Sequence, residues 1–262
     1  MNTIDDYLSS GAKDIAPLLS LALQKNTAQI YAQPKYQLNT QEKNLLDSLI
    51  EKRSSGIPFA YLSGTKGFYH LDFQVTPDVL IPRPETELLI DIALDLFPNK
   101  QKPCDVLDLG TGSGVIAITL ADKNPNWHVT AIDLSKQALD IARKNATTKI
   151  DFIQGSWFEP IVNQSFDLIV SNPPYIKEND PYLEKLKNEP TSALVSGKSG
   201  LNDINAIIKQ APKYLKPCGY LLMEHGYDQQ DQVVDLLKKE FKNILRFKDY
   251  NQNDRAVLAQ IA

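Results

Sequence analysis

The spacing of apolar residues changes near residue 80 and indicates two kinds of structure in one chain. Before that point, apolar residues recur every three or four positions, as at Ile15, Leu18, Leu19 and Leu23, which is the spacing of an amphipathic helix. Asn39 or Thr40 is a plausible N-cap for a later helix of the same kind. Residues 1–66 are therefore predicted to form a small helical domain that docks the substrate.

After residue 100, short apolar runs alternate with amphipathic segments. The runs at 104–110, 128–133, 150–155, 166–172 and 219–226 predict strands, and the segments at 113–124, 135–146, 201–215 and 228–241 predict helices. This alternation is typical of an α/β fold, in which a parallel sheet carries helices on both faces. Residues 67–85 are predicted to form a hairpin and a connector. The chain is thus divided into a helical domain (1–66), this connecting segment and an α/β domain (86–262).

A glycine-rich loop, "DLGTGSG" at 108–114, follows the first predicted strand of this α/β region. Glycine lets a backbone turn sharply and approach a ligand closely. The predicted cofactor-binding residues of this loop are Gly110, Thr111, Gly112, Ser113 and Gly114. Asp133 ends the next strand roughly 20 residues later, where a carboxylate can accept hydrogen bonds from ribose hydroxyls.

The glycine spacing favours S-adenosylmethionine over a nicotinamide dinucleotide. The dinucleotide fingerprint, counted from Gly110, needs its third glycine at position 115, where this chain has Val115. An adenine ring also needs an apolar surface, and aromatic residues follow the third strand in "GSWFEP". Trp157 is the stronger candidate for the adenine contact, whereas a role in the core is equally consistent for Phe158.

The fourth strand ends in "NPPY", residues 172–175. Because a residue before proline is pushed into extended conformations, the carbonyl groups of Asn172 and Pro173 are predicted to point away from any helical turn. The Asn172 side-chain oxygen and the Pro173 carbonyl then form a pair of acceptors for a planar –NH2 group. Tyr175 follows Pro174 and can stack on that plane. The Asn172 amide must donate elsewhere, and the cofactor is a candidate acceptor.

These motifs resemble class I S-adenosylmethionine-dependent methyltransferases that act on planar amino groups. More specifically, "PFAYLSGTKGFYHLDFQV", "LIPRPETE", "EPTSALVSGKSGL", "MEHGYDQ" and "NDRAVL" resemble the release factor glutamine methyltransferases, the PrmC (HemK) family. The resemblance implies a Rossmann-like sheet with helices on both faces, preceded by a small helical domain. It also implies methyl transfer to the glutamine side chain of the Gly-Gly-Gln motif in peptide chain release factors.

By the same resemblance, Gly110 to Gly114, Asp133, Trp157 and Asn172 contact the cofactor. Asn172, Pro173, Pro174 and Tyr175 contact the glutamine, and Asn172, Pro173 and Tyr175 carry the catalysis. Ser156 stands where the family often has an acidic residue. No metal is expected, because the three histidines do not cluster.

The alternative activity is methylation of adenine amino groups in nucleic acid, since adenine also presents a planar –NH2 group. Such enzymes must flip the base and usually carry a basic recognition region. The chain has a net charge of −4 and only short segments between the elements after residue 176, so nucleic-acid binding is not expected. A non-enzymatic adaptor would not need the tetrapeptide. The absence of a signal sequence or a long apolar run predicts a cytoplasmic protein with no membrane partner.

Overall fold

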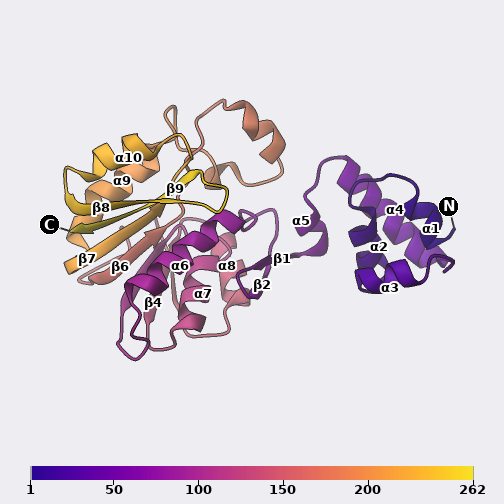
Figure 1. Ribbon diagram of the computed structural model, residues 1–262, viewed down its shortest axis with the longest axis horizontal. Helices are drawn as coiled ribbons and strands as arrows, with labels where there is room; N and C mark the ends of the chain where they lie inside the picture. The colour runs from indigo at the N-terminus through magenta and orange to yellow at the C-terminus, as the bar shows by residue number, and fades with distance from the viewer. Residues whose placement is uncertain (1, 262) are drawn as a thin grey trace. The chain divides into compact units, whose positions relative to one another are not determined.

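The computed structural model describes residues 2–261 (Figure 1). Contacts along the backbone divide the chain into two compact units, Met1–Thr65 and Lys66–Ala262. The hairpin that follows the helical region therefore belongs to the second unit. No helix within residues 2–261 is long and apolar enough to span a membrane.

The first unit consists of helices, as the apolar spacing predicted. They are α1 (Ile4–Leu8), α2 (Ile15–Leu23), α3 (Thr27–Ala32), α4 (Thr40–Ser54) and α5 (Phe59–Ser63). Asn39 caps α4, because its side chain accepts from the Glu42 amide while the Glu42 side chain accepts from the Asn39 amide. A core of buried apolar residues that includes Leu18, Leu19 and Leu46 holds the helices together.

The second unit opens with the predicted hairpin, β1 (Thr65–Phe68) and β2 (Leu71–Gln74). A 3₁₀ turn, η1 (Pro84–Thr86), leads into helix α6 (Glu87–Leu96), which the sequence analysis did not predict. Apolar residues occupy most positions of α6 and its first residues make no side-chain cap. The segment nevertheless carries helical signals, since Thr86 precedes it and Glu87, Asp91 and Asp95 recur every four residues.

A seven-stranded sheet forms the centre of this unit, with the order β5-β4-β3-β6-β7-β9-β8. Its strands are β3 (Asp105–Leu109), β4 (His128–Asp133), β5 (Asp151–Gln154), β6 (Phe166–Ser171), β7 (Leu215–Glu224), β8 (Phe241–Lys248) and β9 (Asp254–Ile261). The first five strands in this order are parallel, as predicted, but β9 runs antiparallel to both β7 and β8. The five predicted strands are thus parallel, and the sheet becomes mixed only at β9, because a short turn joins β8 to β9 and a parallel pair needs a long crossover.

Helices cover both faces of the sheet, which confirms the predicted fold class. α7 (Val115–Lys123) and α6 pack on one face, and α9 (Asn202–Gln210) and α10 (Gln230–Leu237) pack on the other (Figure 1). α8 (Lys136–Asn145) lies beside the start of α7. The remaining elements are short 3₁₀ turns: η2 (Pro181–Leu186), η3 (Thr191–Ala193) and η4 (Ala211–Lys213).

The sheet order places the predicted site residues at one edge. β3 lies between β4 and β6, and Leu109, the last residue of β3, pairs with Ile132 on one side and Ser171 on the other. The residues that follow these positions are Gly110, Asp133 and Asn172. Loops that leave neighbouring parallel strands in this way open a crevice beyond the carboxyl ends, which is where such sheets bind ligands.

Candidate active site

The glycine loop passes directly from β3 into α7. Gly110, Gly112 and Gly114 all have positive φ angles, a region that other residues rarely adopt. At Gly112 a side chain would meet nothing within 4 Å, so this position leaves open space beside the backbone. At Gly114, the N-cap of α7, a Cβ would lie 2.6 Å from Cδ1 of Ile118. Gly112 therefore leaves room for a ligand, whereas Gly114 allows close packing of the helix.

Asp133 fixes the shape of this loop from the end of β4. Its Oδ2 accepts a hydrogen bond of 2.8 Å from the Gly112 amide, and its Oδ1 accepts one of 2.8 Å from the Ser135 amide. A carboxylate oxygen can accept more than one hydrogen bond, so both oxygens can also accept from a ligand hydroxyl. Burial raises the pKa of Asp133, and the two amide donors oppose that rise.

Asp108 lies beneath the loop and is completely buried. Its Oδ2 accepts from the Thr111 hydroxyl at 2.6 Å and from the Ala117 amide at 3.2 Å, whereas its Oδ1 is buried without a partner. Burial raises the pKa of Asp108 to about 7. The carboxyl group therefore joins the loop to the first turn of α7 while titrating near neutral pH.

A cavity of about 500 Å³ opens beside the loop. Its lining includes most of the predicted cofactor-binding residues, namely Gly110, Thr111, Gly112, Ser113, Asp133, Trp157 and Asn172. Ser156 also lines it. Phe158 does not: it is completely buried and stacks on Tyr214 at 4.6 Å between ring centroids. Of the two aromatic candidates, Trp157 is thus the one placed at the cavity.

A second cavity of about 730 Å³ is lined by Pro173 and Tyr175, together with Arg83, Glu224 and Tyr227. Asn172 lines both cavities. The tetrapeptide at the end of β6 therefore lines both spaces, with Pro174 at the smaller one and Pro173 and Tyr175 at the larger one. This is the arrangement needed to bring two ligands to one amide group.

The Asn172 side chain donates one of its two amide N–H bonds to a protein atom, so the cofactor remains a predicted acceptor for the other. Nδ2 of Asn172 donates a hydrogen bond of 2.9 Å to Oγ1 of Thr86. Thr86 in turn donates to Glu224 at 2.7 Å. No residue within 2–261 donates to Oδ1 of Asn172, so that oxygen remains available to a ligand.

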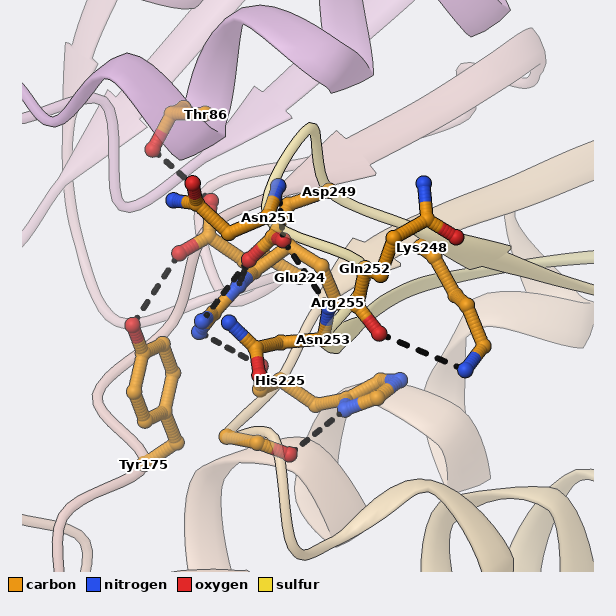
Figure 2. Close-up of polar contacts among 11 residues, drawn as sticks. Thr86, Tyr175, Glu224, His225, Lys248, Asp249, Asn251, Gln252, Asn253 and Arg255 are labelled. Atoms are coloured by element: carbon orange, nitrogen blue, oxygen red, sulfur yellow. Dashed lines mark hydrogen bonds and ion pairs between the residues drawn. The ribbon is translucent and has the colours of Figure 1, made fainter.

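Buried charges surround the tetrapeptide. Glu224 is 1% exposed and also accepts a hydrogen bond of 3.1 Å from the Tyr175 hydroxyl (Figure 2). Burial raises the pKa of Glu224, while the Thr86 hydrogen bond and the charge of Arg255 oppose the rise. Arg255 itself pairs with the buried Asp249 at 3.2 Å. The arrangement keeps a carboxylate close to Asn172 without exposing it to water.

Comparison with known proteins decides the family. Residues 6–64 match the model of the PrmC N-terminal domain, and residues 100–259 match that of a methyltransferase domain. The release factor glutamine methyltransferase of Vibrio cholerae is 43% identical over 259 residues, which cover 96% of this chain and 90% of the relative. That of Escherichia coli is 37% identical over 258 residues, covering 96% and 92%. The chain belongs to the release factor glutamine methyltransferase family.

Solved structures confirm the fold of this family member. A methyltransferase from Pyrococcus furiosus, 19% identical, has a TM-score of 0.54 and covers 83% of this chain and 98% of its own. The T. thermophilus 16S rRNA N2 G1207 methyltransferase, solved with AdoMet and guanosine, is 18% identical with a TM-score of 0.58 and covers 76% and 50%. Both TM-scores support the methyltransferase fold of this chain.

Several site residues of this methyltransferase were not identified from residue chemistry. Thr86, Glu189 and Glu224 lie in stretches that pointed to the family but to no particular role. Thr86 and Glu224 lie beside Asn172 through their hydrogen bonds, whereas Glu189 holds the connector: Arg83 donates to Glu189 at 2.5 Å, and Glu189 also accepts from the Ile81 amide at 3.0 Å. The contacts of Glu189 join positions more than 100 residues apart in the chain, which local pattern alone does not reveal.

We predict that Asp133→Ala weakens binding of S-adenosylhomocysteine by roughly 1.5 to 3 kcal/mol, the range for a hydrogen bond to a charged group. Calorimetry measures the affinity. Asp140→Ala in α8 is the matched control, because it removes the same charge from an exposed carboxylate that pairs with the exposed Arg143. Unchanged affinity in Asp133→Ala would refute the ribose assignment.

We predict that Asp108→Asn alters the pH dependence of stability. Because its pKa is raised, the Asp108 carboxyl group binds a proton more tightly in the native state than in the unfolded chain. The protonated Asp108 therefore makes its full contribution to the free energy of unfolding at low pH. That contribution is lost as pH rises toward about 7. The free energy of unfolding of the variant, relative to the original protein, should therefore rise by roughly 2.6 kcal/mol between pH 5 and pH 8. Urea denaturation at the two pH values measures it, and parallel pH profiles would contradict the assignment.

Proposed function

We propose that this protein transfers a methyl group from S-adenosylmethionine to the side-chain amide nitrogen of the glutamine in the Gly-Gly-Gln motif of peptide chain release factors. The observation that supports this most directly is the position of Asn172, which lines both cavities and has an available acceptor oxygen. Family membership supports the same reaction and does not favour adenine methylation.

The residues of the smaller cavity fit S-adenosylmethionine. Its volume is within the range of small-molecule sites. The Asp133 carboxylate can accept from ribose hydroxyls, Gly112 leaves room for close approach, and Trp157 offers an aromatic surface for adenine. The bound cofactor supplies an electrophilic methyl group on a sulfonium sulfur.

The residues of the tetrapeptide act on the nucleophile. An amide nitrogen is a poor nucleophile because its lone pair is delocalised into the carbonyl group. Oδ1 of Asn172 and the carbonyl oxygen of Pro173 accept from the two N–H bonds, which holds the nitrogen in place. The same acceptors stabilise the positive charge that develops during methylation. Tyr175, fixed through its hydroxyl, contacts the plane of the glutamine amide.

The helical unit carries no part of either cavity and is assigned to the protein substrate. All residues that line the two cavities lie after residue 77. We therefore assign recognition of the intact release factor to residues 1–66 and the chemistry to the second unit. Release factors act during translation, so we place the reaction in the cytoplasm, with a protein rather than a nucleic acid as the partner.

We expect Asn172→Ala to lower turnover by about 100- to 1,000-fold, the usual cost of losing one positioned electrostatic contact. Affinity for S-adenosylhomocysteine should change far less, because the contact strengthens as charge develops in the transition state. Single-turnover methylation of purified release factor, measured alongside cofactor binding, separates the two effects. A variant that methylates at the normal rate would exclude the proposed role of the tetrapeptide.

A chain shortened to begin at Lys66 should still bind cofactor but methylate intact release factor at least about tenfold less efficiently, because one of two linked binding contacts is lost. The hairpin must be kept: the Gln74 backbone exchanges hydrogen bonds of 2.7 and 3.0 Å with Asn145, whose Nδ2 also donates to the Ser113 carbonyl at 2.9 Å. A short peptide containing Gly-Gly-Gln is the control, and both chains should methylate it equally. Undiminished activity of the shortened chain on intact release factor would disprove the docking role.

A further inference from the structure

We propose that Thr86 and Glu224 are positioning residues that determine which end of the Asn172 amide faces the substrate. This inference rests on the proposed function, because it explains how the acceptor oxygen of Asn172 is held toward the glutamine. Neither residue is assigned to contact the substrate nitrogen or the cofactor sulfur. Both act through Asn172, and Glu224 also acts through Tyr175.

The three side chains form a continuous series of hydrogen bonds. Glu224 ends β7 and is 1% exposed, and Thr86 lies at the start of α6 and is 2% exposed. The Thr86 hydroxyl donates to Oε2 of Glu224 at 2.7 Å (Figure 2). Nδ2 of Asn172 then donates to Oγ1 of Thr86 at 2.9 Å. Both distances are those of well-formed hydrogen bonds.

The number of available protons fixes which group donates and which accepts in each of these hydrogen bonds. The Thr86 hydroxyl has a single proton, and it donates that proton to Oε2 of Glu224. The Thr86 oxygen can then only accept, and Nδ2 is the only end of the Asn172 amide that can donate to it. The opposite orientation would place Oδ1 against the lone pairs of the Thr86 oxygen. Glu224 therefore sets the orientation of an amide that it does not touch.

Glu224 holds the other end of the tetrapeptide as well. Its Oε1 accepts from the Tyr175 hydroxyl at 3.1 Å, so one carboxylate fixes both Asn172 and Tyr175 (Figure 2). The Tyr175 carbonyl oxygen accepts from Nε2 of Gln229 at 3.0 Å. The first and last residues of "NPPY" are thus held from the same buried group, which sets the acceptor pair and the aromatic ring in one fixed relation.

The Thr86 hydroxyl does not cap helix α6. Thr86 is the N-cap of α6, where a threonine usually accepts a hydrogen bond from a backbone amide of the first turn. Here the side chain makes no capping hydrogen bond. Its hydroxyl is turned instead toward Glu224 and Asn172, which are separated from it by 138 and 86 positions in the chain.

Substitutions at Thr86 test the proposal. Thr86→Val keeps the shape but removes the hydroxyl, and we expect turnover on release factor to fall about 10- to 100-fold, less than for loss of Asn172 itself. Thr86→Ser restores the hydroxyl and should stay within about threefold of the original rate. Since Thr86 also lines the cofactor cavity, affinity for S-adenosylhomocysteine is measured for each variant and should change less than about threefold. Equal losses in the valine and serine variants would overturn the proposal.

A double-mutant cycle separates positioning from an independent effect. If Thr86 acts through Asn172, adding Thr86→Val to Asn172→Ala should slow the reaction by no more than about twofold beyond Asn172→Ala alone. Losses that multiply would show that Thr86 acts in another way. Thr119→Val is the matched control, because it removes a buried hydroxyl in α7 that has no hydrogen-bond partner. It should leave turnover unchanged.

Glu224→Gln tests the role of the carboxylate without creating a cavity, because the two side chains have nearly the same shape. Glutamine has one acceptor oxygen, so it cannot accept from the Thr86 and Tyr175 hydroxyls through two oxygens as Glu224 does. We expect turnover to fall about 10-fold or more while the melting temperature stays close to that of the original protein. Normal turnover in this variant would contradict the assignment of Glu224.

A measurement without substrate distinguishes failure of this inference from failure of the proposed function. Nuclear magnetic resonance of 15N-labelled protein detects the Asn172 side-chain NH2 group, assigned by its loss in Asn172→Ala. Exchange of these protons with solvent should be slow in the original protein and in Thr86→Ser, and at least about tenfold faster in Thr86→Val and Glu224→Gln. Equal exchange in all four proteins would disprove the inference even if release factor is methylated. Slow exchange in a protein that methylates no release factor would instead refute the proposed function alone.

Discussion

The site depends on the parallel pairing of β3 with β4 on one side and β6 on the other. The amides of Gly110 and Thr111 both donate to the Ile132 carbonyl, at 2.9 and 3.0 Å, so the glycine loop stays bonded to β4 after β3 has ended. On the other side, the Ser171 hydroxyl donates to the Leu109 carbonyl at 2.7 Å. The three strand ends are thereby held at one level. The loop, the acid and the tetrapeptide can then meet at a fixed separation.

Two buried carboxyl groups in this framework show different solutions to the same electrostatic problem. An unpaired charge in the interior is costly, and a protein either neutralises it or supplies donors. Asp108 has an unpartnered oxygen and a pKa raised to about 7, so its proton offsets part of the cost. Glu224 instead receives two hydroxyl hydrogen bonds and lies near Arg255. Burial raises the pKa of Glu224 as well, but both of its carboxyl oxygens accept a hydroxyl hydrogen bond beside the tetrapeptide.

The sequence predicted what depends on neighbours in the chain and missed what depends on distant ones. Asp133 ends a strand, and the glycine loop and "NPPY" each follow one, so the strand pattern was sufficient to bring them to the same end of the sheet. The contact of Thr86 with Glu224 spans 138 positions, and no local spacing encodes it. The antiparallel direction of β9 was not predicted for a similar reason, since the apolar pattern of this strand fits either direction in the sheet. Phe158 could be placed in the core only once its stacking partner Tyr214 was known.

The chemistry of position 172 explains why an amide side chain suits it better than a carboxylate. On one side lies the Thr86 oxygen, whose proton is already used toward Glu224, so a donor is needed there. On the other side, the glutamine –NH2 group of the proposed substrate would present only donors, so an acceptor is needed. Asparagine is short, neutral and carries one group of each kind.

Aspartate would offer the substrate an acceptor but would face the Thr86 oxygen without a donor. It would also add a second negative charge close to a buried carboxylate, which is unfavourable in an environment of low dielectric. The tetrapeptide and the distant pair Thr86–Glu224 therefore form one unit in which each hydrogen bond fixes the direction of the next.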